Sequence, residues 1–368
     1  MRQLIEKKLQ EYYGRNIPVR ILDRVSFELK RMEECGLSRE FFLLHRLVRV
    51  LKSRQIPFYL GGEASSSILL YLLGASSVNP LQAHYYNPIE RKIEFSDEAE
   101  DGYDLPDRSA PWISDGHNVS AEIFWGTGSS DEGNICPNIS LRLPERAFSK
   151  IRRRMLTDAK YDGLEKKDIV HGRGFQCGHI FLSGNMALPE KEITWYYPLS
   201  AKKVREYELQ NFSTALRLDP NTDAIPKTFL GVLRIFGLTR GSWSHVNNQR
   251  TAENSGMNEE TYFSLEDFGY SLDVVPAFYD DVFDMVLREG YPEEEAYYEA
   301  KRVSLGRGLS ERTKDVLYDR PEIPWCNSAI RLYSKAHALE YLLMDYRIFR
   351  EEGRKKERIE EAGVRENK

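Results

Sequence analysis

Three short segments carry side chains whose types and spacing could support chemistry. The first consists of small and polar residues: Gly61, Gly62, Glu63, Ala64, Ser65, Ser66 and Ser67. It follows a short apolar run and precedes an apolar segment, and small residues in such a turn let backbone N–H groups approach a phosphate at a helix N-terminus. It has neither a Walker lysine nor GxGxxG spacing. By itself this pattern favours a structural turn and helix cap.

The other two segments contain histidine. Cys177 and His179 are two residues apart, which on one strand would place both on the same face, as a metal site or a nucleophile with its base requires. No third ligand is nearby, so structural roles are favoured. Lys335 and His337 precede an apolar run, where they could bind phosphate or act as acid and base. A helix-start cap and a packing histidine are equally consistent. No strand carries the D-x-D pair that holds two metal ions.

The elements that must position these residues follow from hydrophobic periodicity. Apolar residues at helical spacing predict two helices within 19–54, separated at Gly36. Residues 79–135 are rich in Pro, Gly, Asp and Ser and indicate irregular connections around a sheet, with β-type runs such as 119–125. Further helices are predicted over 68–73 and 144–157, and strands over 56–60, 139–143, 179–182 and 192–197.

The composition changes near residues 219–226, after which the chain reads as helix almost throughout to Arg358. We therefore predict a first domain over 1–222, a helical domain over 223–350 and a charged C-terminal tail over 351–368. Residues 253–299 contain fourteen acidic residues and one basic residue, whereas 300–358 contain fourteen basic and nine acidic residues. Solvated helix faces are the usual reason for such runs, and the acidic block is an unlikely DNA-binding surface.

Composition limits the classes of protein. The chain has 368 residues, 41% of them hydrophobic, and a net charge of −5, which argues for a packed globular protein and excludes a globally basic nucleic-acid binder. The four cysteines are far apart and form no CxxC pair, so spacing indicates neither a disulfide framework nor a zinc site. The N-terminus has no signal-like apolar run and the chain has no membrane-spanning run, so we expect a cytoplasmic protein.

Segments spread over residues 20–350 share their order and spacing with one family. They are 66–81 followed by His84-Tyr85, 102–107 followed by 115–117, and 306–309 followed by Pro324-Trp325 and 334–348. Together they resemble the palm and fingers of the PolC-type DNA polymerase III alpha subunit, a C-family bacterial replicative polymerase. The resemblance implies an α+β fold, with a polymerase-beta-like nucleotidyltransferase palm of mixed sheet and helices, followed by mostly α-helical fingers.

The metal-binding positions depart from that family. Its P-D-I-D-L-x-F strand places two aspartates where this chain has Asn138 and Ser140, and its third palm aspartate falls on Ser213. Phosphoryl transfer by polymerases needs two magnesium ions held by carboxylates. The resemblance therefore implies no functional catalytic residue, no resident metal and no cofactor, with magnesium required only if the chain is an active polymerase after all.

Two further family motifs are also altered. The phosphate loop, G-S-R-G-S-x-G-S-S, falls on residues 59–67, with Gly61 at the arginine and Glu63 at a serine. A triphosphate would lose a cation there and meet an anion. The four zinc-ribbon cysteines of the family palm fall on Asn87, Glu90, Ala110 and Ile113. We therefore expect no zinc site.

These departures predict a catalytically inactive homologue that acts as a nucleic-acid, nucleotide or protein binding module. Remaining contacts with DNA or triphosphate are expected on the basic side of 300–358, from Arg307, Lys335, His337 and Arg347. One alternative is an active DNA-directed DNA polymerase fragment that functions in replication. A second is a structural or interaction protein without nucleic-acid affinity, which the acidic block favours. The partner and the oligomeric state stay open, and no membrane partner is expected.

Overall fold

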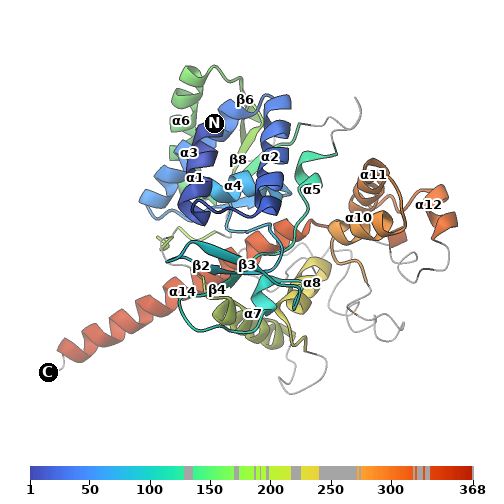
Figure 1. Cartoon of the computed structure of the whole chain (residues 1–368). Coiled ribbons are helices and arrows are strands. Elements are labelled where there is room, and N and C mark those ends of the chain that lie inside the picture. Colours follow the sequence, from blue (N-terminus) through green and yellow to red (C-terminus); the bar gives the residue numbers. More distant parts are fainter. Residues whose placement is uncertain are drawn as a thin grey trace.

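A computed structural model of the chain combines two β-sheets with helices (Figure 1). It describes residues 1–127, 136–169, 174–185, 188–190, 192–195, 199–216, 225–239, 272, 275–317, 320, 326–327 and 332–366. The predicted α+β class is confirmed in this coarse form. Within the described part of the chain, no helix is long and apolar enough to cross a membrane.

The larger sheet has five strands in the order β1-β5-β8-β7-β6. Its strands are β1 (Tyr59–Gly61), β5 (Ile139–Pro144), β6 (Lys166–Ile169), β7 (Gly174–Cys177) and β8 (Ile180–Asn185). The pair β5 and β8 is parallel and the other pairs are antiparallel, so the sheet is mixed. Alternation along β5 buries Ile139, Leu141 and Leu143 on one face. The opposite face therefore carries Ser140 and Arg142.

The smaller sheet lies in the segment for which irregular connections were predicted. It is antiparallel, in the order β3-β2-β4, and comprises β2 (His84–Asn87), β3 (Lys92–Phe95) and β4 (Ile113–Asp115). The 3₁₀ turn η2 (Gly102–Asp104) lies between β3 and β4 in sequence. The β-type run at 119–125 was predicted wrongly, because its end forms helix α5 (Glu122–Trp125). Ile123, Phe124 and Trp125 are all buried, so the run has no alternation that would require a strand.

Helices of the first half surround the larger sheet. They are α1 (Arg2–Tyr13), α2 (Val19–Glu34), α3 (Ser38–Ser53), α4 (Ile68–Leu72) and α6 (Glu145–Asp162), with the 3₁₀ turn η1 (Ala64–Ser66) before α4. The predicted break at Gly36 is confirmed. Gly36 has φ of +66°, and the Leu37 amide donates to the Met32 carbonyl oxygen, a helix ending that favours glycine. The predicted strand at 192–197 does not form over its described residues, 192–195.

In the described part of the second half the regular elements are helices, as predicted, apart from an isolated bridge between Phe278 and Tyr333. It contains α7 (Ala201–Leu216), α8 (Phe229–Thr239), α10 (Tyr279–Arg288), α11 (Glu293–Ser304), α12 (Glu311–Val316) and α14 (Lys335–Glu366). Helix α14 contributes Met344 and Ile348 to the core around the larger sheet, and Leu339 and Leu343 to the core around α8. Figure 1 shows it crossing between these two parts. The domain boundaries at 222 and 350 stay predictions: residues 217–224 lie outside the described ranges, and α14 continues through 350.

Candidate functional site

The loop of residues 61–67, which we call the loop remnant, joins the edge strand β1 to helix α4. Gly62 has φ of +75°, a conformation that glycine adopts without strain, and a Cβ there would have no atom within 4 Å. Ser67 is extended, with φ of −88° and ψ of 122°, directly before Ile68 begins α4. The predicted strand, turn and helix are therefore present, with the strand at 59–61 rather than 56–60.

An internal carboxylate occupies the N-terminus of α4. Glu28 of α2 is 0% exposed, and its carboxylate accepts hydrogen bonds from the Ser67 hydroxyl at 2.5 Å and the Ile68 and Leu69 amides at 3.0 and 3.4 Å. Arg24, one turn earlier on α2, donates from Nε to Glu28 Oε1 at 2.7 Å. The donors that a phosphate loop would offer to an anion are thus engaged by the protein itself.

Helix α14 holds the other side of the loop remnant. The Gly62 amide donates to His337 Nδ1 at 2.6 Å, and the Ser334 hydroxyl donates to the Gly62 carbonyl oxygen at 3.3 Å. Because Nδ1 accepts, the imidazole is neutral in this arrangement. The ring centroids of Tyr333 and Tyr341 each lie 4.7 Å from that of His337. This geometry agrees with the packing interpretation of His337 rather than with a free acid or base.

A second buried carboxylate also belongs to the contact between the loop remnant and α14, which we call the joint. Glu340 of α14 accepts hydrogen bonds from the Ser65 and Ser76 hydroxyls, at 2.8 and 2.5 Å, and from the Ser77 amide at 2.8 Å. Burial raises the pKa of Glu340, although these three donors act in the opposite direction. The joint is therefore made of internal hydrogen bonds on both sides of the loop remnant.

Glu63, the acidic residue of the loop remnant, is paired with a cation. Its carboxylate accepts a hydrogen bond from Lys301 of α11. Lys301 Nζ also lies 4.9 Å from the ring centroid of Tyr279 and 5.4 Å from that of Tyr297. Burial, and then the Glu63 carboxylate, raise the pKa of Tyr279. This ion pair connects Glu63 to helix α11 of the helical half. Lys301 is therefore not a free cation that could bind a phosphate.

The three positions that match the family's aspartates do not converge. Ser140 is opposite Gly61 in the antiparallel pair of β1 and β5, and Asn138 is exposed just before β5. Ser213 instead lies on helix α7, where its hydroxyl donates to the Leu209 carbonyl oxygen at 2.7 Å. Figure 1 shows α7 in the lower part of the molecule, away from β8 and the larger sheet. Ser140 therefore adjoins the loop remnant, whereas Ser213 does not.

Arg142 is a cation near the loop remnant that the sequence analysis missed. It lies two residues after Ser140 on β5, and a Cβ on Gly61 would be 3.4 Å from both Arg142 Nε and Ser140 Oγ. Arg142 Nη1 donates to Ser183 Oγ at 2.6 Å. The alternation of β5 is the sequence signal that would have placed its side chain on the same face as Ser140.

The cations predicted to contact DNA are not presented together. Lys335 is 4% exposed, and its Nζ lies 3.6 Å from Glu100 Oε1. Arg347 lies against Trp195, with 5.3 Å between the guanidinium carbon and the ring centroid, and burial lowers its pKa. Arg307 is exposed after α11. Only one of these three cations is therefore fully open to a large ligand.

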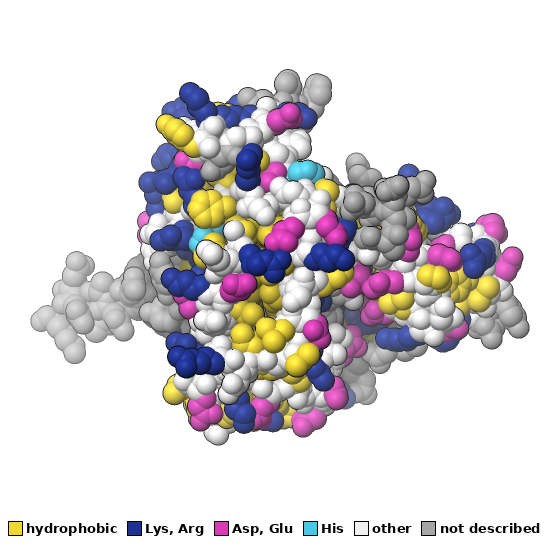
Figure 2. All heavy atoms as spheres, turned by 45° about the horizontal axis from the view of Figure 1, so that its top comes forward, with side chains coloured by type: hydrophobic (Ala, Val, Ile, Leu, Met, Phe, Trp, Pro, Cys, Tyr) yellow, Lys and Arg dark blue, Asp and Glu magenta, His cyan; other side chains and the backbone are white. Residues whose placement is uncertain are grey.

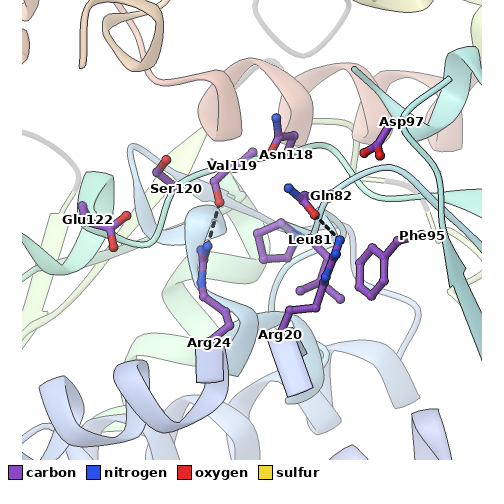
Figure 3. Close-up of a pocket in the computed structure, with 11 residues that line it drawn as sticks. Arg20, Arg24, Leu81, Gln82, Phe95, Asp97, Asn118, Val119, Ser120 and Glu122 are labelled. Atoms are coloured by element: carbon purple, nitrogen blue, oxygen red, sulfur yellow. Dashed lines mark hydrogen bonds between the residues drawn. The ribbon is translucent and has the colours of Figure 1, made fainter. Parts of the chain in front are cut away.

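A cavity of about 500 Å³ adjoins Arg24 (Figure 3). Arg20 donates to the Gln82 side-chain oxygen at 2.7 Å, and its guanidinium carbon lies 4.7 Å from the Phe95 ring centroid. Figure 3 shows the acidic residues Asp97 and Glu122 across the cavity from these arginines. Two cations and two carboxylates balance in charge, so this lining is unsuited to a polyanion such as a triphosphate.

Cys177 and His179 do not share a strand face, contrary to the sequence-based expectation. Cys177 ends β7 and is buried in the core, whereas His179 lies in the tight turn to β8, after Gly178 with φ of +54°. The hairpin between β7 and β8 separates the two side chains. The described residues contain no group of three or more His, Cys, Asp or Glu side chains that could hold a metal ion.

The positions that match the family's zinc ribbon lie around the smaller sheet. Asn87 ends β2, and its side-chain oxygen accepts hydrogen bonds from the Ile89 and Glu90 amides at 3.0 and 3.1 Å. Ile113 of β4 is opposite Tyr86. An asparagine amide thus closes the turn after β2, where thiolates would be required to bind zinc.

We predict that a chelator leaves the thermal unfolding midpoint of the chain unchanged. The four positions of the ribbon hold an amide, an exposed carboxylate and two aliphatic side chains, at Asn87, Glu90, Ala110 and Ile113, and this set lacks the thiolate ligands of a structural zinc site. Elemental analysis and thermal unfolding with and without EDTA test this. Stoichiometric zinc whose removal lowers the midpoint would contradict it.

The comparisons with known proteins bear on this site. Residues 1–107 match a family described as the bacterial DNA polymerase III alpha NTPase domain. The chain is 34% identical over 139 residues to the DNA polymerase III PolC-type of Ureaplasma parvum, and 31% identical over 156 residues to that of Mycoplasma genitalium. The corresponding polymerase of Thermotoga petrophila is 33% identical over 156 residues. The resemblance to PolC-type DNA polymerase III is confirmed.

The similarity to PolC-type polymerases covers part of each protein. These matches span 36–40% of the chain and 9–11% of the relatives. The chain thus corresponds to about a tenth of the length of the curated relatives that it matches. The family match includes the loop remnant and Asn87, but it ends before Ser140 and Ser213.

The sequence analysis did not identify several residues that make up this site. Glu28 shares one helix face with Ile21, Val25 and Met32, all buried, so a carboxylate within an apolar stripe was the available signal. Lys301 and Glu340 gave no comparable local signal, because each meets the loop remnant from more than 230 residues away.

Proposed function

We propose that the chain is a non-catalytic relative of PolC-type DNA polymerase III that acts as a binding module. The observation that carries this proposal is the Glu28 carboxylate, which engages Ser67 and the first amides of α4. A phosphate loop must offer these donors to its ligand. In this chain a nucleoside triphosphate would have to displace a buried, arginine-paired carboxylate.

The positions of the family's aspartates support the same proposal. Asn138, Ser140 and Ser213 are neutral, and magnesium sites in phosphoryl-transfer enzymes are built on carboxylates. Each metal effect is worth several kcal/mol, and about 1.4 kcal/mol corresponds to tenfold in rate. Ser213 also lies on α7, whereas Ser140 lies on β5. A carboxylate at 213 would therefore not complete a pair beside the loop remnant.

The finer assignment of the fold is part of this proposal. We assign the five-stranded mixed sheet with its covering helices to a polymerase-beta-like palm, supported by the loop remnant at its edge strand. We assign the helical segment 223–350 to the fingers. In this arrangement α14 connects the palm to the fingers through its contacts with β1 and α8. Because the donors of the loop remnant are engaged internally, we expect the chain to bind its partner through surfaces outside the loop remnant.

We predict that the chain shows no magnesium- or manganese-dependent extension of a primed DNA template. The triple variant Asn138→Asp, Ser140→Asp, Ser213→Asp is expected to remain inactive as well, because Glu28 still fills the α4 N-terminus and residue 213 lies on α7. Primer extension with labelled primer measures this, and binding of magnesium-dATP is followed in parallel by calorimetry.

The outcomes separate the three readings of the chain. Extension by the unmodified protein, abolished by a variant at residues 61–63, would establish the active-polymerase alternative and refute the non-catalytic proposal. Extension by the triple variant alone would refute only the argument about geometry. Absence of extension together with absence of any nucleic-acid binding would favour the structural alternative.

A further inference from the structure

Helices α3 and α6 form a basic surface outside the candidate site. Together they contain ten Lys and Arg and four Asp and Glu, a net charge of +6 in a chain whose net charge is −5. Arg39, near the start of α3, adjoins Gly163 just after α6, where a Cβ would be 3.3 Å from its Nη1. Arg46 Nη2 lies 3.4 Å from Asp158 Oδ2. The two helices are therefore adjacent and antiparallel.

Four cations of this surface are open to solvent. Arg39, Arg46 and Arg49 recur at helical spacing on the outer side of α3, and α6 presents Lys150 and Arg153. Arg39, Arg49, Lys150 and Arg153 are exposed, and none of them pairs with an acidic side chain among the residues that the structure describes. Figure 2 shows Lys and Arg side chains gathering at the upper left, the region where α3 and α6 lie in Figure 1. Their charge is thus available to a polyanion.

Two aromatic side chains lie on the same helices and are unusually open. Phe42 of α3 is 46% exposed and Tyr161 of α6 is 82% exposed. Phe42 falls in the stripe that contains Arg39, Arg46 and Arg49. Exposed aromatic rings beside exposed cations such as Arg39 and Arg49 are what proteins use to stack on unpaired bases while the cations follow the phosphates.

We propose that this α3–α6 surface binds single-stranded nucleic acid. Phe42 and Tyr161 stack on bases, and the exposed cations Arg39, Arg49, Lys150 and Arg153 contact phosphates. The combination favours a single strand, because the base faces in a duplex are already stacked on one another and only unpaired bases can stack on the two exposed rings. The proposal deepens the proposed function and rests on it only in that the chain acts by binding.

The test measures binding of a fluorescent oligothymidylate to the full chain by anisotropy at several salt concentrations. The double variant Arg49→Glu, Arg153→Glu is expected to bind about tenfold or more weakly, with a salt slope smaller by about 1.4, since each lost phosphate contact removes about 0.7. The variant Phe42→Ala, Tyr161→Ala is expected to bind at least about fivefold more weakly at an unchanged salt slope.

A matched control keeps the same change in net charge. The variant Arg15→Glu, Lys203→Glu alters two exposed cations outside α3 and α6 and is expected to bind like the parent. Equal weakening in this control, or no binding by the parent at low salt, would overturn the proposal. So would aromatic variants that bind like the parent while heparin competes fully, since that identifies a general polyanion surface.

Circular dichroism confirms that the variants are folded. Primer extension is scored separately, so either proposal can fail alone.

Discussion

Replacement of Glu28 by alanine is expected to lower the free energy of unfolding by about 3–5 kcal/mol, the cost of breaking a buried charge pair. The Glu28 side chain is 0% exposed and that of its partner Arg24 is 18% exposed. The substitution leaves the Arg24 guanidinium without its carboxylate and removes the acceptor for Ser67, Ile68 and Leu69. Urea denaturation followed by circular dichroism measures the change.

Helix α2 supplies a matched control. Glu33 pairs with Arg2 at 2.9 Å, but both side chains are about half exposed, at 48% and 51%. Glu33→Ala is expected to cost about 1 kcal/mol or less, as exposed ion pairs do. Glu28→Gln should lie between the two, because its amide oxygen still accepts a hydrogen bond. If the alanine variants at 28 and 33 lose equal stability, Glu28 does not hold the loop remnant as described.

The Asp101–His117 pair is expected to make a large contribution to stability that depends on pH. Both side chains are 0% exposed, and His117 Nδ1 lies 3.0 Å from Asp101 Oδ2. Burial lowers the pKa of His117, but the Asp101 carboxylate outweighs it and the net pKa is raised above 6.5. Burial raises the pKa of Asp101, but His117 outweighs it and the net pKa is lowered below 3.8.

These directions fix the pH window. The histidine contribution is complete below pH 6.5 and is lost as pH rises through the raised pKa of folded His117. The aspartate contribution is complete above pH 3.8 and is lost as pH falls through the lowered pKa of folded Asp101. His117→Gln should therefore cost about 3–5 kcal/mol near pH 5 and less at alkaline pH. Urea unfolding at a series of pH values measures the difference.

His84 is the matched control with the opposite trend. It is also 0% exposed, and burial lowers its pKa, so its neutral form is the one favoured in the fold. The cost of His84→Gln should increase as pH rises toward 6.5, whereas the cost of His117→Gln should decrease as pH rises further. A cost of His117→Gln that is flat or grows with pH would show that the pair is not charged in the fold.

The elements that sequence reasoning found are those with strong local periodicity. Helices α2 and α3, their break at Gly36, strand β5 and the helical second half follow from apolar spacing and from a glycine that ends a helix. The run at 119–125 misled because its apolar residues are buried on all sides. In such a run, the two-residue period of a strand and the short helix α5 cannot be told apart.

The partners of the loop remnant were beyond local reasoning for a physical reason. The sequence around Gly62 and Ser65 does not indicate whether their hydrogen-bond donors contact a ligand, a carboxylate or water. Gly62 donates to His337 and Ser65 donates to Glu340, while Glu28 accepts from the Ile68 amide that follows the loop remnant. The fold brings all three acceptors from elsewhere in the chain. The sequence around Ser213 likewise does not indicate that its hydroxyl donates a hydrogen bond within α7, to the Leu209 carbonyl oxygen.

The joint between the loop remnant and α14 has a consequence for the order in which the protein forms. Gly62 and His337, and likewise Ser65 and Glu340, are separated by 275 residues. At synthesis rates of about 5–20 residues per second, a nascent chain waits roughly 15–55 seconds between emergence of the loop and emergence of its partners. Contacts of such sequence separation also close slowly in refolding. Until α14 arrives, the Gly62 amide and the Ser65 hydroxyl do not have their native partners, so this joint forms late in folding.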